Sequence, residues 1–192
     1  EGTVLEEKKF DSVGPLIGQE LKQKTITAAI VSLILMIVYI AFAFRKVQRP
    51  VSSWVYGIIS FVGLCHDIFI PLGVFAILGR FYGIEITIPV ITALLTVLGS
   101  SINNTIVVFD RIRENLLRRG DAFEDIVNSG MSQTASRQIN TSIAMLLSVV
   151  AIFFFGGITL KYFALALIIG ILAGTYSSFF IAAPLLVTWY KF

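Results

Sequence analysis

Polar side chains that could bind a proton or carry a charge lie within or beside apolar runs at three points of the chain. His66 and Asp67 are adjacent near the centre of one run. Asn103 and Asn104 interrupt another, and Arg137 stands just before a third. Polar groups inside a membrane are costly and tend to face protein or water, which makes them the first candidates for function. The chemistry open to these residue types is proton transfer or hydrogen bonding between helices.

The His66–Asp67 pair allows two interpretations. An ionised carboxylate alone at mid-bilayer costs roughly 2.5–3.5 kcal/mol on insertion scales, so Asp67 needs a donor from another helix, or a proton. His66 is not expected to supply that donor, because adjacent positions of a helix point about 100° apart. The pair is therefore either a hydrogen-bonded contact between helices or part of a protonation pathway.

The run that contains the two asparagines carries a mostly polar stripe. Its members recur at the three- and four-residue spacing of one helix face: Thr96, Ser100, Asn103, Asn104, Val107, Asp110 and Arg111. On the spacing alone, the favoured interpretation is hydrogen bonding between helices, which contributes about 0.6 kcal/mol per bond in membrane proteins.

The fourth and fifth apolar runs also carry patterned faces. The face of the fourth consists of Arg137, Asn140, Thr141, Ala144 and Ser148. Arg137 either snorkels to the lipid headgroups or reaches a carboxylate on a neighbouring helix. The fifth run has small residues at Gly170, Gly174 and Ser178, a spacing that lets helix backbones approach closely and indicates packing. Since three neighbouring helices each bring a polar face, the sequence predicts a buried polar seam between them.

The elements that must position these residues are membrane helices. Of the 192 residues, 56% are hydrophobic and 14% are charged, whereas soluble domains carry roughly 25% charged residues. Five apolar runs are long enough to cross about 30 Å of hydrocarbon, at residues 25–44, 54–78, 86–109, 139–155 and 162–190. The predicted fold is therefore an all-α polytopic membrane protein with five transmembrane helices.

The basic residues predict the orientation of this membrane domain, residues 25–192. Clusters at 45–49 and 111–119 flank apolar runs, so they are interpreted as cytoplasmic loop charges and not as a nucleic-acid footprint. This places a cytoplasmic loop at 110–137, the C-terminus in the cytoplasm and residues 1–24 outside. Within the loop, Asp121 and Glu124 have the spacing of a capping box, which predicts a separate short helix. The single cysteine, Cys65, excludes an intrachain disulfide and a CxxC metal site, and no cofactor is expected.

Five stretches of the chain, in order, resemble the SecF family of bacterial protein-export membrane subunits. They are FDSVGPLIGQEL, HDIFIPLGVFAILG, SINNTIVVFDRIREN, SQTASRQINTS and GTYSSFFIAAPLL, and together they cover almost the whole chain. The resemblance implies the C-terminal part of a longer polypeptide, residues 1–24 being the end of a periplasmic domain. Residues 25–192 would hold spans two to six, which form half of a pseudo-symmetric bundle of the RND superfamily.

The resemblance also implies a function and partners. Such a chain would be an accessory subunit of the Sec translocase in the bacterial plasma membrane. It would have no ATPase of its own, and with SecD it would use the proton-motive force to promote late steps of preprotein export. The implied partners are SecD, the SecYEG channel, YajC, YidC, the preprotein and the lipid bilayer.

The family's proton path is carried over onto this chain at two positions. Arg137 matches an arginine of that path, and Asn104 stands where the family motif SxNDT has its aspartate. An amide hydrogen-bonds but does not ionise, so Asn103 and Asn104 would form the polar core of a path whose own titrating residue is missing. Either the protein depends on the carboxylate of SecD together with Arg137, or Asn104 is an engineered replacement of the aspartate. His66 and Asp67 are the further candidates.

Two other functional classes remain open at this point. One is a fragment of an RND-type small-molecule exporter, which the length of the parent chain would distinguish. The other is a non-conducting scaffold of the translocon. In that case, export would not respond when the proton gradient is collapsed.

Overall fold

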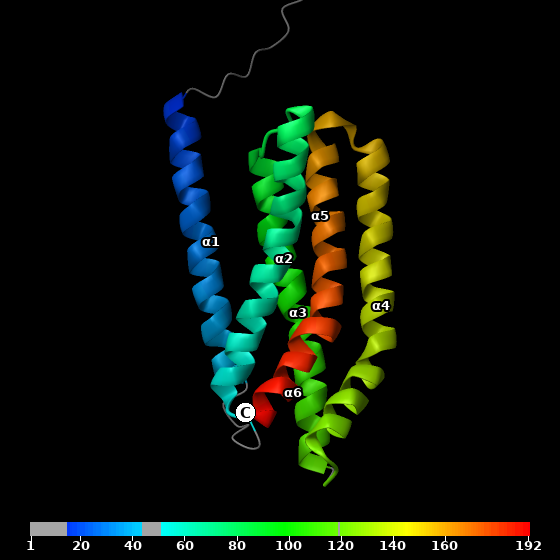
Figure 1. Ribbon diagram of the computed structural model, residues 1–192. Coiled ribbons are helices and arrows are strands. Elements are labelled where there is room, and N and C mark those ends of the chain that lie inside the picture. The colour runs from blue at the N-terminus through cyan, green and yellow to red at the C-terminus, as the bar shows by residue number, and fades with distance from the viewer. Residues whose placement is uncertain (1–14, 44–50, 119) are drawn as a thin grey trace, which may run out of the picture.

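The computed structural model describes residues 15–43, 51–118 and 120–192, and every regular element within them is helical (Figure 1). The elements are α1 (Pro15–Ala43), α2 (Ser53–Tyr82), α3 (Ile88–Arg118), α4 (Phe123–Phe155), α5 (Gly157–Ser177), the π-helical turn η1 (Ser178–Ala182) and α6 (Ala183–Lys191). The predicted basic cluster at 45–49 and most of the predicted external lead-in lie outside the described residues.

The described helices have the length and composition of membrane spans. Four helical stretches are long and apolar enough to cross a membrane: Ser53–Tyr82, Ile88–Arg118, Phe123–Phe155 and Leu160–Lys191. A fifth apolar stretch, Ile26–Ile40 within α1, is shorter. The predicted fold class, an all-α multi-pass membrane protein, is confirmed.

The helices stand side by side, with α1 and α4 at opposite sides and α2, α3 and α5 between them (Figure 1). Two glycines bring α5 onto α3. A Cβ atom on Gly170 would collide with Val97, and one on Gly174 would lie 3.0 Å from the Cβ of Ser101. Because a Cβ atom has no room at Gly170 and would be crowded at Gly174, the two glycines set how closely the backbones approach.

The buried apolar residues form two clusters at different levels of the bundle. One contains Leu64 on α2 and Phe179 on η1, and the other contains Phe75 on α2 and Ile171 on α5. Along α2, Asp67 lies between Leu64 of the first cluster and Phe75 of the second.

The connection between α3 and α4 is shorter than the predicted loop at 110–137. α3 continues to Arg118 and α4 begins at Phe123, so most of that stretch is helical. The predicted separate short helix and its capping box are wrong, because α4 runs without interruption to Phe155 and its N-cap residue is Ala122, with no side-chain cap. The physical reason is continuity of the buried face. Phe123 packs on the ring of Tyr190 in α6, 4.6 Å between centroids, and nothing after it breaks the helix.

Candidate functional site

α3 presents two polar faces to different neighbours. Ser101 and Thr105 are buried on the side of α2, α5 and η1. Ser100, Asn103 and Asn104 line spaces on the side of α4. The sequence predicted one seam, but the structure has two polar sites separated by the body of α3.

The first site is a closed network of hydrogen bonds around the carboxylate of Asp67, a residue that is 0% exposed. The hydroxyl of Ser101 donates to Oδ2, and the hydroxyl of Ser177 donates to the same oxygen at 2.8 Å. The imidazole of His66 donates from Nδ1 to Oδ1 at 2.9 Å. Of the two alternatives predicted for Asp67, a donor from another helix or a proton, the structure supplies the donors, since Ser101 belongs to α3 and Ser177 to α5.

The expectation that His66 would not supply a donor to Asp67 is wrong, because the two side chains are in contact. The Cβ atoms of adjacent helix residues do diverge, but the imidazole Nδ1 lies far enough from the backbone to reach back to the next carboxylate. The side chain of His66 is 28% exposed and stacks beside the ring of Tyr176, with 6.2 Å between centroids. His66 therefore connects the covered carboxylate of Asp67 to the outer surface of the bundle.

The π-helical turn continues the closed network. Ser178, its first residue, donates to the carbonyl oxygen of Gly174 at 2.8 Å and shares a hydrogen bond of 3.2 Å with Thr105. Consecutive serines of this segment thus bond to two neighbouring helices, Ser177 to α2 and Ser178 to α3. π-helical turns are rare and often mark functional positions, and here the turn accompanies a network that ties α2, α3 and α5 together.

The second site consists of three spaces along α3 and α4, the first of which is also lined by α5, and we call them the α3–α4 groove. The first, of 410 Å³, is lined by Thr96, Ser100, Met145, Ser148, Val149, Leu167 and Ile171. The middle space, of 240 Å³, is lined by Asn103, Asn104, Val107, Arg137, Gln138 and Thr141. The last, of 280 Å³, is lined by Val107, Asp110, Arg111, Glu114, Gln133, Thr134 and Arg137. The groove thus contains all seven residues of the stripe noted in the sequence.

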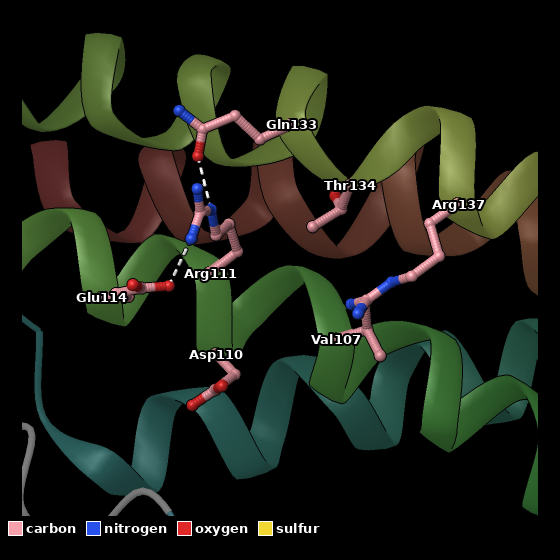
Figure 2. Close-up of a pocket in the computed structure, with 7 residues that line it drawn as sticks. All are labelled: Val107, Asp110, Arg111, Glu114, Gln133, Thr134 and Arg137. Carbon is pink, nitrogen blue, oxygen red and sulfur yellow. Dashed lines mark hydrogen bonds and ion pairs between the residues drawn. The ribbon is translucent and has the colours of Figure 1, made fainter.

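Arg137 lies where the middle and last spaces meet. Its guanidinium extends from α4 toward α3 beside Val107 (Figure 2). The nearby charges are engaged elsewhere: Arg111 binds Glu114 and also donates to Gln133 at 2.5 Å. Asp110 points away from Arg137 (Figure 2) and pairs with Arg113 at 3.5 Å. Within the described part of the chain, no carboxylate lies at ion-pair distance from Arg137.

Gln138 was missed by the sequence reasoning. It is 3% exposed, and neither its Oε1 nor its Nε2 has a hydrogen-bond partner. The available signal was the four-residue spacing of Thr134, Gln138 and Ser142, which are all buried on one face of α4. Asn140, by contrast, is exposed and lines none of the three spaces. Among the described residues, no group of three or more His, Cys, Asp or Glu side chains could hold a metal ion.

These observations define a multi-pass membrane protein with two intramembrane polar sites, one closed by its own hydrogen bonds and one open as a groove. The family model for the C-terminal part of the protein export membrane proteins SecD and SecF matches residues 2–192. The chain belongs to this SecD/SecF family.

The similar proteins agree with this assignment. A protein translocase subunit SecF from Thermobaculum terrenum is 51% identical over 96% of this chain and 57% of the relative. A protein translocase subunit SecDF from Thermus thermophilus is 42% identical over 93% of this chain and 23% of the relative. A crystal structure of SecDF in a super-membrane-facing form matches with a TM-score of 0.78 and 39% identity, over 93% of this chain and 22% of that one. The chain therefore spans a little over half the length of its SecF relative.

Proposed function

We propose that this chain is the membrane part of an accessory subunit of the Sec protein translocase, which uses the proton-motive force together with SecD to promote late steps of preprotein export. Membership of the protein-export family supports the role in export. A relative named as one SecDF subunit supports SecD as the partner. SecYEG, YajC and YidC are further proposed partners. The subunit is proposed to have no ATPase activity of its own.

The observation that carries the coupling role is the state of Arg137 in the α3–α4 groove. A guanidinium inside a membrane protein requires an anionic or water-filled environment, and the described chain offers no carboxylate to it. Asn104, in the same space, cannot ionise. We propose that a SecD carboxylate faces Arg137 in the groove, and that protons reach that carboxylate from water.

His66 and Asp67 are the second candidate for proton binding. His66 is partly exposed and contacts the covered carboxylate of Asp67 directly, so a proton could enter from the surface of the bundle. The carboxylate already accepts three hydrogen bonds from its own chain. That saturation favours a structural role for Asp67 and leaves the groove as the preferred route.

The proposed orientation places the connection between α3 and α4 in the cytoplasm of a bacterium, on the inner face of the plasma membrane. Arg111, Arg113 and Arg118 are at this end of α3, as the excess of basic residues on the cytoplasmic side requires. The C-terminus lies at the same end of the bundle (Figure 1), where Lys191 pairs with Glu124 at 2.8 Å. The C-terminus is therefore proposed to be cytoplasmic.

The test uses the full-length protein with its SecD partner in cells depleted of both. The late, ATP-independent release of a secreted protein is followed with and without an uncoupler. We expect gradient-dependent release for the wild type and its loss, by at least about tenfold, for Arg137→Ala, since an essential charge is removed. Arg118→Ala is the matched control, because Arg118 is exposed, pairs with Glu114 and lies outside the groove.

The other outcomes separate the alternatives. Normal gradient-dependent release by Arg137→Ala, with loss in Asp67→Asn, would move the proton route to the closed network. Equal release by the wild type with the gradient collapsed would make the chain a scaffold of the translocon. In both cases, assembly with SecD is measured by co-purification, so that a missing complex is not mistaken for a missing proton route.

A further inference from the structure

The buried amide of Gln138 is not explained by the packing of this chain. The residue is 3% exposed and lines the middle space of the groove beside Arg137 and Asn104. Neither atom of the amide has a hydrogen-bond partner. A buried donor and a buried acceptor without partners destabilise a fold, and natural proteins keep few of them. An amide in this state points to a partner that this chain does not supply.

The chemistry of an amide selects one kind of partner. Its carbonyl oxygen accepts and its NH₂ group donates, side by side. A protonated carboxyl group offers the complementary pair, an O–H donor beside a C=O acceptor, so the two groups can form two parallel hydrogen bonds. An ionised carboxylate has acceptors only and would leave the Oε1 of Gln138 unsatisfied.

The neighbouring residue has the opposite preference. A guanidinium has donors only, and it binds an ionised carboxylate through charge-assisted and often bidentate hydrogen bonds. Arg137 and Gln138 line the same space, so the space contains one group suited to each protonation state of a carboxyl. Asn104 carries an amide as well, but it is only partly buried.

We propose that Gln138 binds the protonated form of the carboxyl group that Arg137 binds in its ionised form. The proposal rests on the proposed function, which brings a SecD carboxylate into the groove. The step is a proton addition alone: the carboxylate takes one proton, loses its ion pair with Arg137 and gains two hydrogen bonds with Gln138. Since both amide atoms are covered in this structure, the side chain of Gln138 must turn toward the space, which its rotatable bonds permit.

The charged groups around this space leave Arg137 as its principal electrostatic influence. The middle space is lined from α3 and α4 only, and Arg137 is its one titratable side chain among the described residues. In the adjoining space, Arg111 is bound to Glu114, and Asp110 is turned away and paired with Arg113. Protonation of a carboxyl group in this space therefore mainly changes whether that group binds Arg137 or Gln138.

The test is Gln138→Leu in the full-length protein assembled with SecD in lipid vesicles. Infrared difference spectra follow the carbonyl band of the protonated carboxyl group as pH is changed. We expect the midpoint of protonation to fall by about one pH unit, a tenfold loss of proton affinity, because the protonated form loses its partner. Gradient-dependent export should fall about tenfold. The thermal stability of the variant should stay the same or rise, because leucine removes two unsatisfied polar atoms without leaving a cavity.

The control is Asn140→Leu, which removes an exposed amide outside the groove on the same helix, and it should change neither the midpoint nor export. An unchanged midpoint in Gln138→Leu overturns the proposal, and a change confined to the bands of bound water would show that the amide binds water only. If the wild type itself exports equally without a gradient, the proposed function fails first, and the spectra still decide whether Gln138 binds a carboxyl group.

Discussion

The two sides of α3 differ in how their polar groups are satisfied. On the side of α2 and α5, the carboxylate of Asp67 is covered and accepts hydrogen bonds from three donors of this chain. On the side of α4, the described chain gives Arg137 no carboxylate, and the amide of Gln138 is buried without a partner. One polar site is complete within this chain, and we propose that a second molecule completes the other.

This difference in hydrogen bonding distinguishes a structural polar site from a binding site better than the residue types do. Aspartate and histidine are the residues that first suggest proton chemistry, yet they belong to the site whose hydrogen bonds are closed. Amides are usually assigned to packing, yet they line the open site. Buried polar groups that are fully bonded hold a fold together, whereas unbonded ones require an explanation outside it. The groove is therefore the better place to look for the proposed partner.

The largest expected effect comes from forcing apart α3 and α5, the two helices that supply Ser101 and Ser177 to the first site. Gly170→Leu places a side chain where Val97 already lies, so α5 must move away from α3 and Ser177 from Asp67. Overpacking of this kind destabilises a fold by roughly 3 kcal/mol. Thermal denaturation of the full-length complex in detergent measures it. Gly63→Ala is the control, because its Cβ would meet no atom within 4 Å, and equal melting of the two variants would contradict the close approach of α3 and α5.

A smaller loss is expected when the carboxylate itself is removed. Asp67→Ala deprives Ser101, Ser177 and His66 of their common acceptor. Hydrogen bonds to charged groups contribute about 1.5–3 kcal/mol each. The variant also no longer has to bury a charge, which offsets part of this loss, and we expect the free energy of unfolding to fall by roughly 2 kcal/mol. Chemical denaturation checks the value. Ser177→Ala, which removes one donor, should cost about half as much, and a stabilised Asp67→Ala variant would show that the network does not hold the helices.

The sequence predicted the fold class and the polar stripe of α3, since both follow from composition and helical period. It did not predict that adjacent Ser100 and Ser101 serve different sites, because a stripe of three- and four-residue spacing is broad enough to touch two neighbours. Which neighbour each residue meets depends on the closeness of α5, set by Gly170 and Gly174. Gln138 was missed because the four-residue spacing of Thr134, Gln138 and Ser142 shows a shared helix face but not that this face is buried.

The smallest effect on stability is expected where a charge is added to the open site. Asn104→Asp places a carboxylate of nearly equal size in the space that Arg137 lines, and the partly exposed position lets water and the guanidinium stabilise it. We expect a change in stability below about 1 kcal/mol, with gradient-dependent export retained or raised, because the groove gains a titrating group of its own.

The contrast that sharpens this prediction is the same charge on the other face of α3. Ser101→Asp, three positions earlier, sets a second carboxylate against the covered one of Asp67, where neither water nor a described arginine relieves the repulsion. That variant should fail to assemble stably with SecD, whereas Asn104→Asp should assemble normally, as measured by co-purification and thermal denaturation. If the two variants behaved alike, an added carboxylate would meet the same surroundings on both faces of α3. The helix would then not separate a closed site from an open one.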